Sequence, residues 1–258
     1  MKNYDNRLGQ TRYNHEDDLM KIVKYNNSND ILVEFQDEHK SVVHTKYCHF
    51  IKGCVRNPYG TKIFGVAMLG NKHHAWVGNK ATKEYGVWKR MLQRCYDKNY
   101  QSVQKTYEDA VCCEEWLLFD NFYEWLHSQE NFNKWLNGYR WALDKDILVK
   151  GNKMYNLDTC CLVPQNVNSL FTKRNADRGE LPIGVHEQLG RYLSTCCNPL
   201  VNEQVYLGSF DAPTQAFEVY KEYKEDIIKQ VAQKEFDAGN ITEQCYNAMM
   251  SYEVEITD

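Results

Sequence analysis

Short runs of apolar residues separated by polar turns dominate the beginning of the chain. Residues 19–25, 31–35 and 41–44 are rich in Leu, Ile and Val, and an Asn- and Asp-rich stretch, 26–30, separates the first two. β-branched runs divided by such turns are typical of antiparallel hairpins. We therefore expect a small β-rich module over residues 1–70, built as a strongly bent sheet or a barrel.

The apolar spacing becomes that of helices between residues 82 and 126. Apolar side chains recur there at steps of three and four residues, at Val87, Trp88, Met91, Leu92 and Cys95. A second apolar segment, 114–126, carries acidic residues in its first turn, where the helix dipole favours negative charge. The pattern predicts a helical domain over residues 71–178.

The pattern of apolar residues changes at the end of this helical domain. Residues 143–148 and 160–164 have the composition of strands, and residues 165–171 that of a short helix. That order predicts a β-hairpin packed on a helix.

Three more strands and a long helix are expected in a last module, residues 179–258. The strands are residues 183–186, 191–196 and 205–210, and Pro213 then opens an amphipathic helix at a position where proline costs no hydrogen bond. A final helix is expected over residues 243–252, after a break at residues 237–240. The fold class predicted for the chain is α+β with several modules.

Charge is distributed unevenly along the chain. The 258 residues include 31 Lys and Arg against 35 Asp and Glu, a formal net charge of −4. Residues 211–258 hold 11 acids and 4 bases, net −7, which leaves 27 bases and 24 acids, net +3, for residues 1–210. A negative total therefore does not exclude a local positive surface of the kind that binds phosphate.

Two classes of protein are disfavoured by composition. No apolar run approaches the ~20 residues that cross a bilayer, and the first residues are polar, so we expect neither a membrane partner nor export, and a cytoplasmic location. The ten cysteines include no C-x-x-C pair, so no zinc site is expected and the thiols should stay reduced.

The last module carries a motif that resembles a known family. Its residues are Gly184, Val185, Arg191, Tyr192, the run 206–210, Pro213, Ala216, Phe217 and Tyr220. Over about 40 residues this pattern resembles the plant-type apetala/ethylene-response DNA-binding domain, which in phages and bacteria accompanies homing endonucleases.

The resemblance implies that a three-stranded sheet enters the major groove while a helix behind it supplies the core. The side chains expected to contact DNA are His186, Gln188, Arg191, Tyr192, Gln204 and Tyr206. Family members usually carry several arginines on these strands, and this chain has only Arg191. Lys89, Arg90 and Arg94, in the helical domain, complete the predicted DNA contacts.

Residues 88–171 resemble a second family, the phage HNH-type endonucleases. The resemblance is carried by Trp88, Met91, the runs 94–96, 112–116, 119–122 and 143–146, Tyr155, Cys160 and the run 165–168. It implies a hairpin and helix that hold one divalent metal, here Mg²⁺, on the scissile phosphate, with a histidine that activates water. The resemblance places metal ligands at Asp144 and at Asn166 or Asn168.

The general-base histidine of that family is missing from this chain. Lys145 stands at its position, Thr159 stands where the central Asn is expected, and none of the eight histidines lies between residues 128 and 185. A lysine ammonium cannot accept a proton from water. Asp144, Lys145 and Asp146 are therefore candidates for a catalytic site in which Asp144, Asp146 and an Asn hold Mg²⁺ through oxygen ligands, for a salt-bridge cluster that pins the hairpin, or for a contact of Lys145 with a DNA phosphate.

Two functions follow from these observations. The first is a phage-type protein that binds double-stranded DNA, is related to homing endonucleases and acts in the host cytoplasm, with cleavage left open. The alternative is a non-catalytic interaction protein, a regulator or inhibitor of a host nuclease or anti-phage defence complex, whose acidic end would attract a basic partner. The N-terminal module resembles small β modules of phage proteins and would serve for docking.

Overall fold

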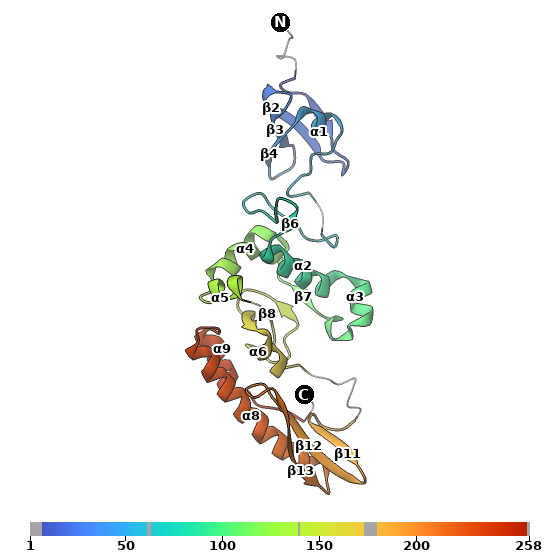
Figure 1. Cartoon of the computed structure of the whole chain (residues 1–258). Coiled ribbons are helices and arrows are strands. Elements are labelled where there is room, and N and C mark those ends of the chain that lie inside the picture. Colours follow the sequence, from blue (N-terminus) through green and yellow to red (C-terminus); the bar gives the residue numbers. More distant parts are fainter. Residues whose placement is uncertain (1–6, 61–62, 139, 173–179, 257–258) are drawn as a thin grey trace. The chain divides into compact units, whose positions relative to one another are not determined.

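The computed structural model describes residues 7–60, 63–138, 140–172 and 180–256 (Figure 1). The chain divides into two compact units, Met1–Leu126 and His127–Asp258. Helices and several small antiparallel sheets occur in both units, so the fold is α+β. The unit boundary falls inside the segment 71–178, and the division into three modules stays a prediction.

The first unit begins with an open, four-stranded antiparallel sheet of order β1-β2-β3-β4. Its strands are β1 (Thr11–Tyr13), β2 (Leu19–Asn27), β3 (Asp30–Phe35) and β4 (Val42–Thr45), and helix α1 (Tyr47–Ile51) follows them. Met20, Ile22, Ile31, Val33 and Phe35 are fully buried, because every second residue of a strand points to the same face. The sheet is not closed into a barrel. Strand β1 and helix α1 were not expected from the sequence.

The rest of the first unit is mainly helical. It contains β5 (Trp76–Val77), β6 (Lys80–Ala81), α2 (Lys83–Tyr96), α3 (Lys98–Val103), β7 (Val111–Cys112), α4 (Phe119–Ser128) and 3-10 turns at Lys105–Tyr107 and Glu114–Leu117. The Thr82 side chain caps α2 by accepting a hydrogen bond from the backbone N–H of Tyr85. Buried aromatic rings hold the helices together, and Trp88 donates its indole N–H to the Trp116 carbonyl oxygen at 2.6 Å.

The second unit starts with α5 (Phe132–Asn137), β8 (Trp141–Asp144), β9 (Met154–Tyr155), β10 (Cys161–Pro164) and α6 (Gln165–Leu170). Strands β8 and β10 are antiparallel, with Asp144 opposite Cys161 and Trp141 opposite Pro164. Helix α6 follows β10 directly, as the sequence predicted. The expected strand over residues 143–148 is wrong beyond Asp144, because the Asp144 carboxylate accepts the next backbone N–H groups and turns the chain.

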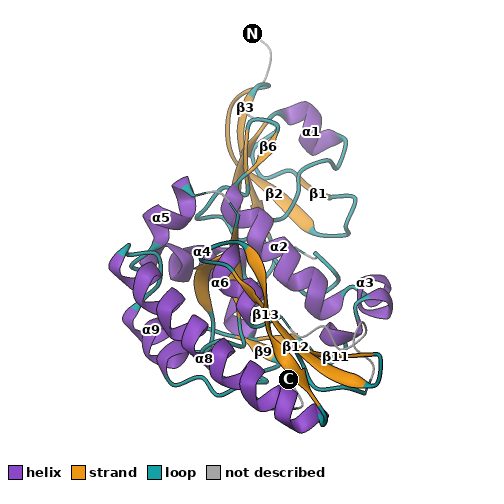
Figure 2. Ribbon diagram, turned by 60° about the horizontal axis from the view of Figure 1, so that its bottom comes forward, coloured by secondary structure: helices purple, strands orange, loops and turns teal. Residues whose placement is uncertain are grey.

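The unit continues with a three-stranded antiparallel sheet of β11 (Val185–Gln188), β12 (Arg191–Asn198) and β13 (Glu203–Phe210). Helix α8 (Pro213–Asp237) lies along this sheet, and α9 (Glu243–Met250) follows after a turn at Gly239 (Figures 1 and 2). One core joins the sheet, α6, α8 and α9, with Val167, Cys196, Ile228 and Met249 among its buried members. None of the helices in the described residues, α8 included, is long and apolar enough to cross a bilayer.

Candidate nucleic-acid interface

The register of the three-stranded sheet separates its side chains into two faces. Val185 pairs with Ser194, which pairs with Gly208, and Val185 and Ser194 are buried on the face toward α8. The other face, here called the outer face, carries His186, Gln188, Arg191, Gln204 and Tyr206. These are five of the six side chains of this sheet that the sequence predicted to contact DNA, and the sixth is Tyr192.

A β-bulge places two of these residues on the outer face. Ser194 pairs with Gly208, yet the next residue, Thr195, pairs with Tyr206, so Leu207 is an extra residue in β13. Without the bulge, alternation counted from Phe210 would turn Tyr206 and Gln204 toward α8. With it, Tyr206 is 60% exposed and Leu207 packs against the core.

Arg191 is held in one orientation by three hydrogen bonds. Its Nε donates to Ser209 Oγ at 2.9 Å, its Nη2 to the Ser209 carbonyl oxygen at 2.9 Å, and its Nη1 to Asp211 Oδ1 at 2.6 Å. Half of the Arg191 side chain is exposed, and so is most of Asp211, so water screens the ion pair and it contributes little stability. The contact also offsets the positive charge of Arg191, the one arginine among residues 185–210.

Tyr192 does not lie with the other predicted DNA contacts. It pairs with Phe210 on the face toward α8, where both rings pack against the core. The neighbour of an outward residue in a strand points to the opposite face. Tyr192 therefore supports the sheet from behind, whereas the predicted DNA contact would need its ring on the outer face.

The sequence did not single out Leu189, although it is the most prominent apolar side chain of this sheet. It stands at the tip of the β11–β12 hairpin, 97% exposed, with a left-handed backbone of φ 53°, and Gly190 follows with φ 76°. Two consecutive left-handed residues are the signature of a type I′ hairpin turn, where Asn-Gly is the favoured pair. The chain places a leucine in the position that suits asparagine.

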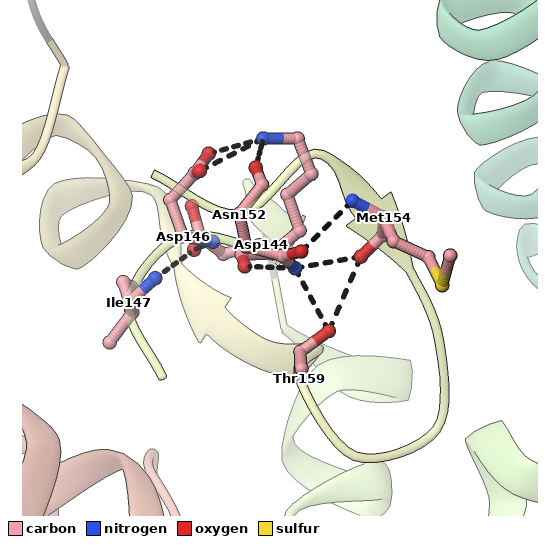
Figure 3. A network of polar contacts seen from close by, with 7 residues as sticks. Asp144, Asp146, Ile147, Asn152, Met154 and Thr159 are labelled. Atoms are coloured by element: carbon pink, nitrogen blue, oxygen red, sulfur yellow. Dashed lines mark hydrogen bonds and ion pairs between the residues drawn. The ribbon is translucent and has the colours of Figure 1, made fainter. Parts of the chain in front are cut away.

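Asp144, the predicted metal ligand of the HNH-like hairpin, acts as a turn cap. Its Oδ1 accepts hydrogen bonds from the backbone N–H groups of Asp146 and Ile147, both at 2.7 Å (Figure 3). Burial raises the pKa of Asp144 above its ordinary value, although the two backbone N–H groups act in the opposite direction. The hydrogen bonds of the Asp144 carboxylate thus turn the chain and end strand β8.

Lys145 is buried, and its ammonium donates three hydrogen bonds. Its ammonium donates to both carboxylate oxygens of Asp146, at 2.9 and 2.7 Å, and to the Asn152 carbonyl oxygen at 2.5 Å. The side chain is only 7% exposed. Of the three roles left open by the sequence, this geometry matches the ion pair that pins the hairpin, with Asp146 as the partner.

Asn152 joins the two sides of the same turn, and the sequence did not identify it. Its Nδ2 donates to the carbonyl oxygens of Lys145 and Met154 and to Thr159 Oγ1, while its Oδ1 accepts the Met154 backbone N–H (Figure 3). An Asn in a Gly-Asn turn signals such backbone bonding. Thr159, at the position where the sequence resemblance led us to expect an Asn, is part of this network.

The residues predicted to share a Mg²⁺ ion with Asp144 are used elsewhere. Asn166 donates to Glu235 Oε1 at 2.9 Å and lies beside Pro164 and Trp141. Asp144 is at the other end of β8 from Trp141, about 10 Å away at the usual rise per residue. Asn168 lies half-buried on α6. Within the described residues no group of three His, Cys, Asp or Glu could hold a metal ion. Asp144 and Asn166 thus make other contacts in this structure, and a magnesium site that includes both stays a prediction.

Three basic residues predicted to contact DNA lie on α2 in the first unit. Lys89 and Arg90 are exposed, and Arg94 is half-buried with its guanidinium 5.2 Å from the centre of the Tyr107 ring. Although Arg90 is exposed at the surface, neighbouring atoms partly desolvate its guanidinium, and this, followed by the charge of Arg94, lowers the pKa of Arg90, which stays charged at neutral pH. Two like charges one helical turn apart favour an anionic partner.

The comparisons with known proteins give no relatives for this chain: no family model matches it, and neither does any curated protein or solved structure.

Proposed function

We propose that this protein binds double-stranded DNA through the outer face of the β11–β13 sheet, as a phage-type relative of homing endonucleases. The proposal rests on the way in which the side chains of the sheet divide between its two faces. Five side chains able to contact bases lie on the outer face, and the opposite face is sealed by α8. A narrow antiparallel sheet fits the major groove, where alternate side chains reach base edges.

Arg191 is the main candidate for base recognition. An arginine fork binds guanine O6 and N7 with two hydrogen bonds, and such a pair discriminates by about 1–3 kcal/mol. Its hydrogen bonds to Ser209 fix the side chain before DNA arrives, which reduces the entropy lost on binding. Asp211 opposes the same contact, because its carboxylate would be placed near DNA phosphates.

The HNH-like hairpin supports binding without cleavage in this proposal. The Lys145 ammonium donates hydrogen bonds to the Asp146 carboxylate and to the Asn152 carbonyl oxygen, so it cannot act as the base that activates water. Asp144 is used as a turn cap. The hairpin then serves as a rigid scaffold within the second unit. The helical, HNH-like middle of the chain and the N-terminal docking module belong to the same proposal.

The second candidate, a non-catalytic regulator or inhibitor that binds a basic host protein, is favoured by one specific contact. Asp211 neutralises the only arginine of the outer face, and it opens a segment, 211–258, of net charge −7. A surface with little net positive charge is poorly suited to phosphate and better suited to a protein.

Salt dependence distinguishes the two candidates. We would titrate the full chain into a labelled pool of random duplexes at several salt concentrations, with Tyr206→Ala on the outer face and Asn247→Ala on α9 as the matched control. DNA binding predicts an affinity that falls steeply with salt, by about 0.9 log units per phosphate contact and log unit of salt, and that Tyr206→Ala weakens. No duplex binding at low salt would reject the proposal in favour of a protein partner.

Cleavage is tested separately in the same samples. Duplexes bound by the protein would be incubated with Mg²⁺ or Mn²⁺ and examined for nicks. The proposal predicts none above the level of an Asp144→Ala variant. Metal-dependent nicking that this variant abolishes would show an active nuclease instead.

A further inference from the structure

An open groove in the second unit is distinct from both the sheet face and the HNH-like turn. It has a volume of about 660 Å³ and is lined by α5, by the first residues of β8 and α6, and by the end of α8 with the turn that follows. This volume is within the range of small-molecule sites, about 300–1,000 Å³. The sequence identified only Asn166 among its lining residues, and assigned it to a metal.

A buried carboxylate is fixed in the wall of the groove. Glu235, on α8, is 7% exposed, and each of its oxygens accepts a hydrogen bond from a different side-chain amide. Asn166 donates to Oε1 at 2.9 Å and Asn240 donates to Oε2 at 2.7 Å. A carboxylate has about four acceptor positions, so, as far as the described residues go, two remain on Glu235.

Four asparagines line the groove: Asn133, Asn137, Asn166 and Asn240. Within the described residues, none of their side-chain oxygens accepts a hydrogen bond. Each amide can both donate and accept. The groove therefore presents unused donors and acceptors side by side.

The charges of the groove cancel. Lys134 donates to the Ala238 carbonyl oxygen at 3.0 Å, and among the described residues its other two N–H groups have no acceptor. Its positive charge offsets that of Glu235. A groove with one charge of each sign and four neutral amides suits an uncharged ligand better than a phosphate or a carboxylate.

An aromatic side chain also lines the groove. The Trp141 indole lies so close to Gly138 that a Cβ atom at residue 138 would overlap its Nε1, so a glycine is needed for this placement. Within the described residues the Trp141 indole N–H has no hydrogen-bond partner. The groove thus combines a flat apolar surface, a free indole donor and amides.

We propose that this groove binds a nucleobase. A nucleobase is planar and uncharged, its edge carries donors and acceptors that amides match, and its faces bind aromatic side chains. The base can belong to a free nucleoside or to an unpaired position of a strand, since both offer the same chemistry. The proposal does not depend on DNA binding by the outer face.

Calorimetric titration of the full chain tests the proposal. The ligands are adenosine, guanosine, cytidine and thymidine, a single-stranded oligonucleotide, and glucose as an uncharged ligand without a flat face. We expect at least one nucleoside or the oligonucleotide to bind at millimolar concentration or below, and glucose not to bind. Nucleoside binding indicates a small-molecule site, and binding of the oligonucleotide alone indicates a strand-held base.

Variants locate the site. Trp141→Ala should weaken binding about tenfold or more, whereas Trp141→Phe, which keeps a ring, should weaken it less. The double variant Asn133→Ala, Asn137→Ala changes only exposed positions of α5. It should also weaken binding, and it tests the location of the site even if Trp141→Ala does not fold. Asn247→Ala on α9 is the matched control and should leave binding unchanged.

Two kinds of result overturn the proposal. One is the absence of binding by all nucleosides and by the oligonucleotide, or glucose binding as tightly as they do. The other is binding that the α5 variants leave unaltered. Failure of the outer-face proposal is seen separately, because Tyr206→Ala acts on duplex binding and should not change nucleoside binding.

Discussion

The backbone of Gly184 lies directly against the ring of Tyr220. Gly184 precedes β11 and has a left-handed φ of 77°, and a Cβ atom at this position would overlap the Tyr220 ring. Tyr220, on α8, is buried in the core of the second unit. This contact fixes the start of the sheet on its helix and explains why both residues belong to one motif.

Replacing Gly184 by alanine should therefore destabilise the protein more than its backbone conformation alone requires. Gly190 provides the control, since it has nearly the same φ, 76°, but open space around its Cα. We expect Gly190→Ala to cost about 1–2 kcal/mol for the left-handed backbone, and Gly184→Ala about 1–3 kcal/mol more for overpacking. Denaturant unfolding measures both, and equal losses would contradict the contact.

The role of Asp144 as a cap predicts opposite effects for two substitutions. Asn keeps an oxygen that can accept the N–H groups of Asp146 and Ile147, and it removes a buried charge. We expect Asp144→Asn to leave the free energy of unfolding unchanged or to raise it, and Asp144→Ala to lower it by about 1–3 kcal/mol. Equal destabilisation by both variants would contradict this role.

The raised pKa of Asp144 also predicts how the stability of the wild type, compared with that of Asp144→Asn, depends on pH. Folding favours the protonated carboxyl, so its stabilising effect is present below the ordinary pKa of 3.8 and is lost as pH rises through the higher folded value. The stability of the wild type relative to Asp144→Asn should thus fall as pH rises through that window. A relative stability that rises with pH there would show a lowered pKa.

Asn152 is expected to be among the most sensitive polar residues of the hairpin. Asn152→Ala removes its bonds to Lys145, Met154 and Thr159, each with a net value of about 0.5–1.5 kcal/mol. We predict a loss of roughly 2–4 kcal/mol in unfolding free energy, against less than about 0.5 kcal/mol for the exposed Asn247→Ala. A loss as small as that of the control would show that the network is not formed in solution.

Arg191 and Asp211 should affect DNA binding in opposite directions. Arg191→Ala removes the cation and should weaken duplex binding by about 1–3 kcal/mol. Asp211→Asn removes the opposing charge and should tighten binding several-fold, most clearly at low salt. Fluorescence anisotropy with the random duplex pool measures both. Two variants that change affinity in the same direction, or not at all, would exclude the outer face as the DNA site.

Replacing Leu189 by asparagine should stabilise the protein. Leucine is disfavoured at φ 53°, and at 97% exposure its side chain contributes little packing. Leu189→Asn creates the preferred Asn-Gly turn and should raise the free energy of unfolding by about 0.5–1 kcal/mol. The thermal midpoint measures the change, with Val201→Asn, an exposed apolar site in the β12–β13 turn, as a comparison. A lower midpoint would show that Leu189 packs against something in solution.

Local patterns predicted the regular elements of the second unit closely. Helix α8 begins at Pro213, as expected, because proline fits a first turn, and it ends before Gly239, whose left-handed φ stops a helix. The order of β8, β10 and α6 followed from short apolar runs. The end of β8 did not, because it depends on hydrogen bonds made by one side chain.

The candidate site was predictable only in part. Arg191, His186 and Gln188 lie outward as alternation requires, whereas Tyr192 lies against the core. The partners of Lys145 could not be chosen from its two flanking aspartates alone, because Asn152 completes its contacts from the other side of the turn. The groove around Glu235 could not be predicted from the sequence, since its lining residues come from two segments, 133–166 and 235–240, that are far apart along the chain.

The sequence by itself indicated where the longer helices and strands form, such as α8 and the strands of the β11–β13 sheet, because these depend on spacing and on neighbours along the chain. Tertiary structure decided which face each side chain occupies and with whom it bonds. The bulge that turns Tyr206 outward and the ion pair that offsets Arg191 arise from pairing between strands and from the packing of one sheet face on α8. Such pairing is set by the burial of the whole core, which no local run of residues specifies.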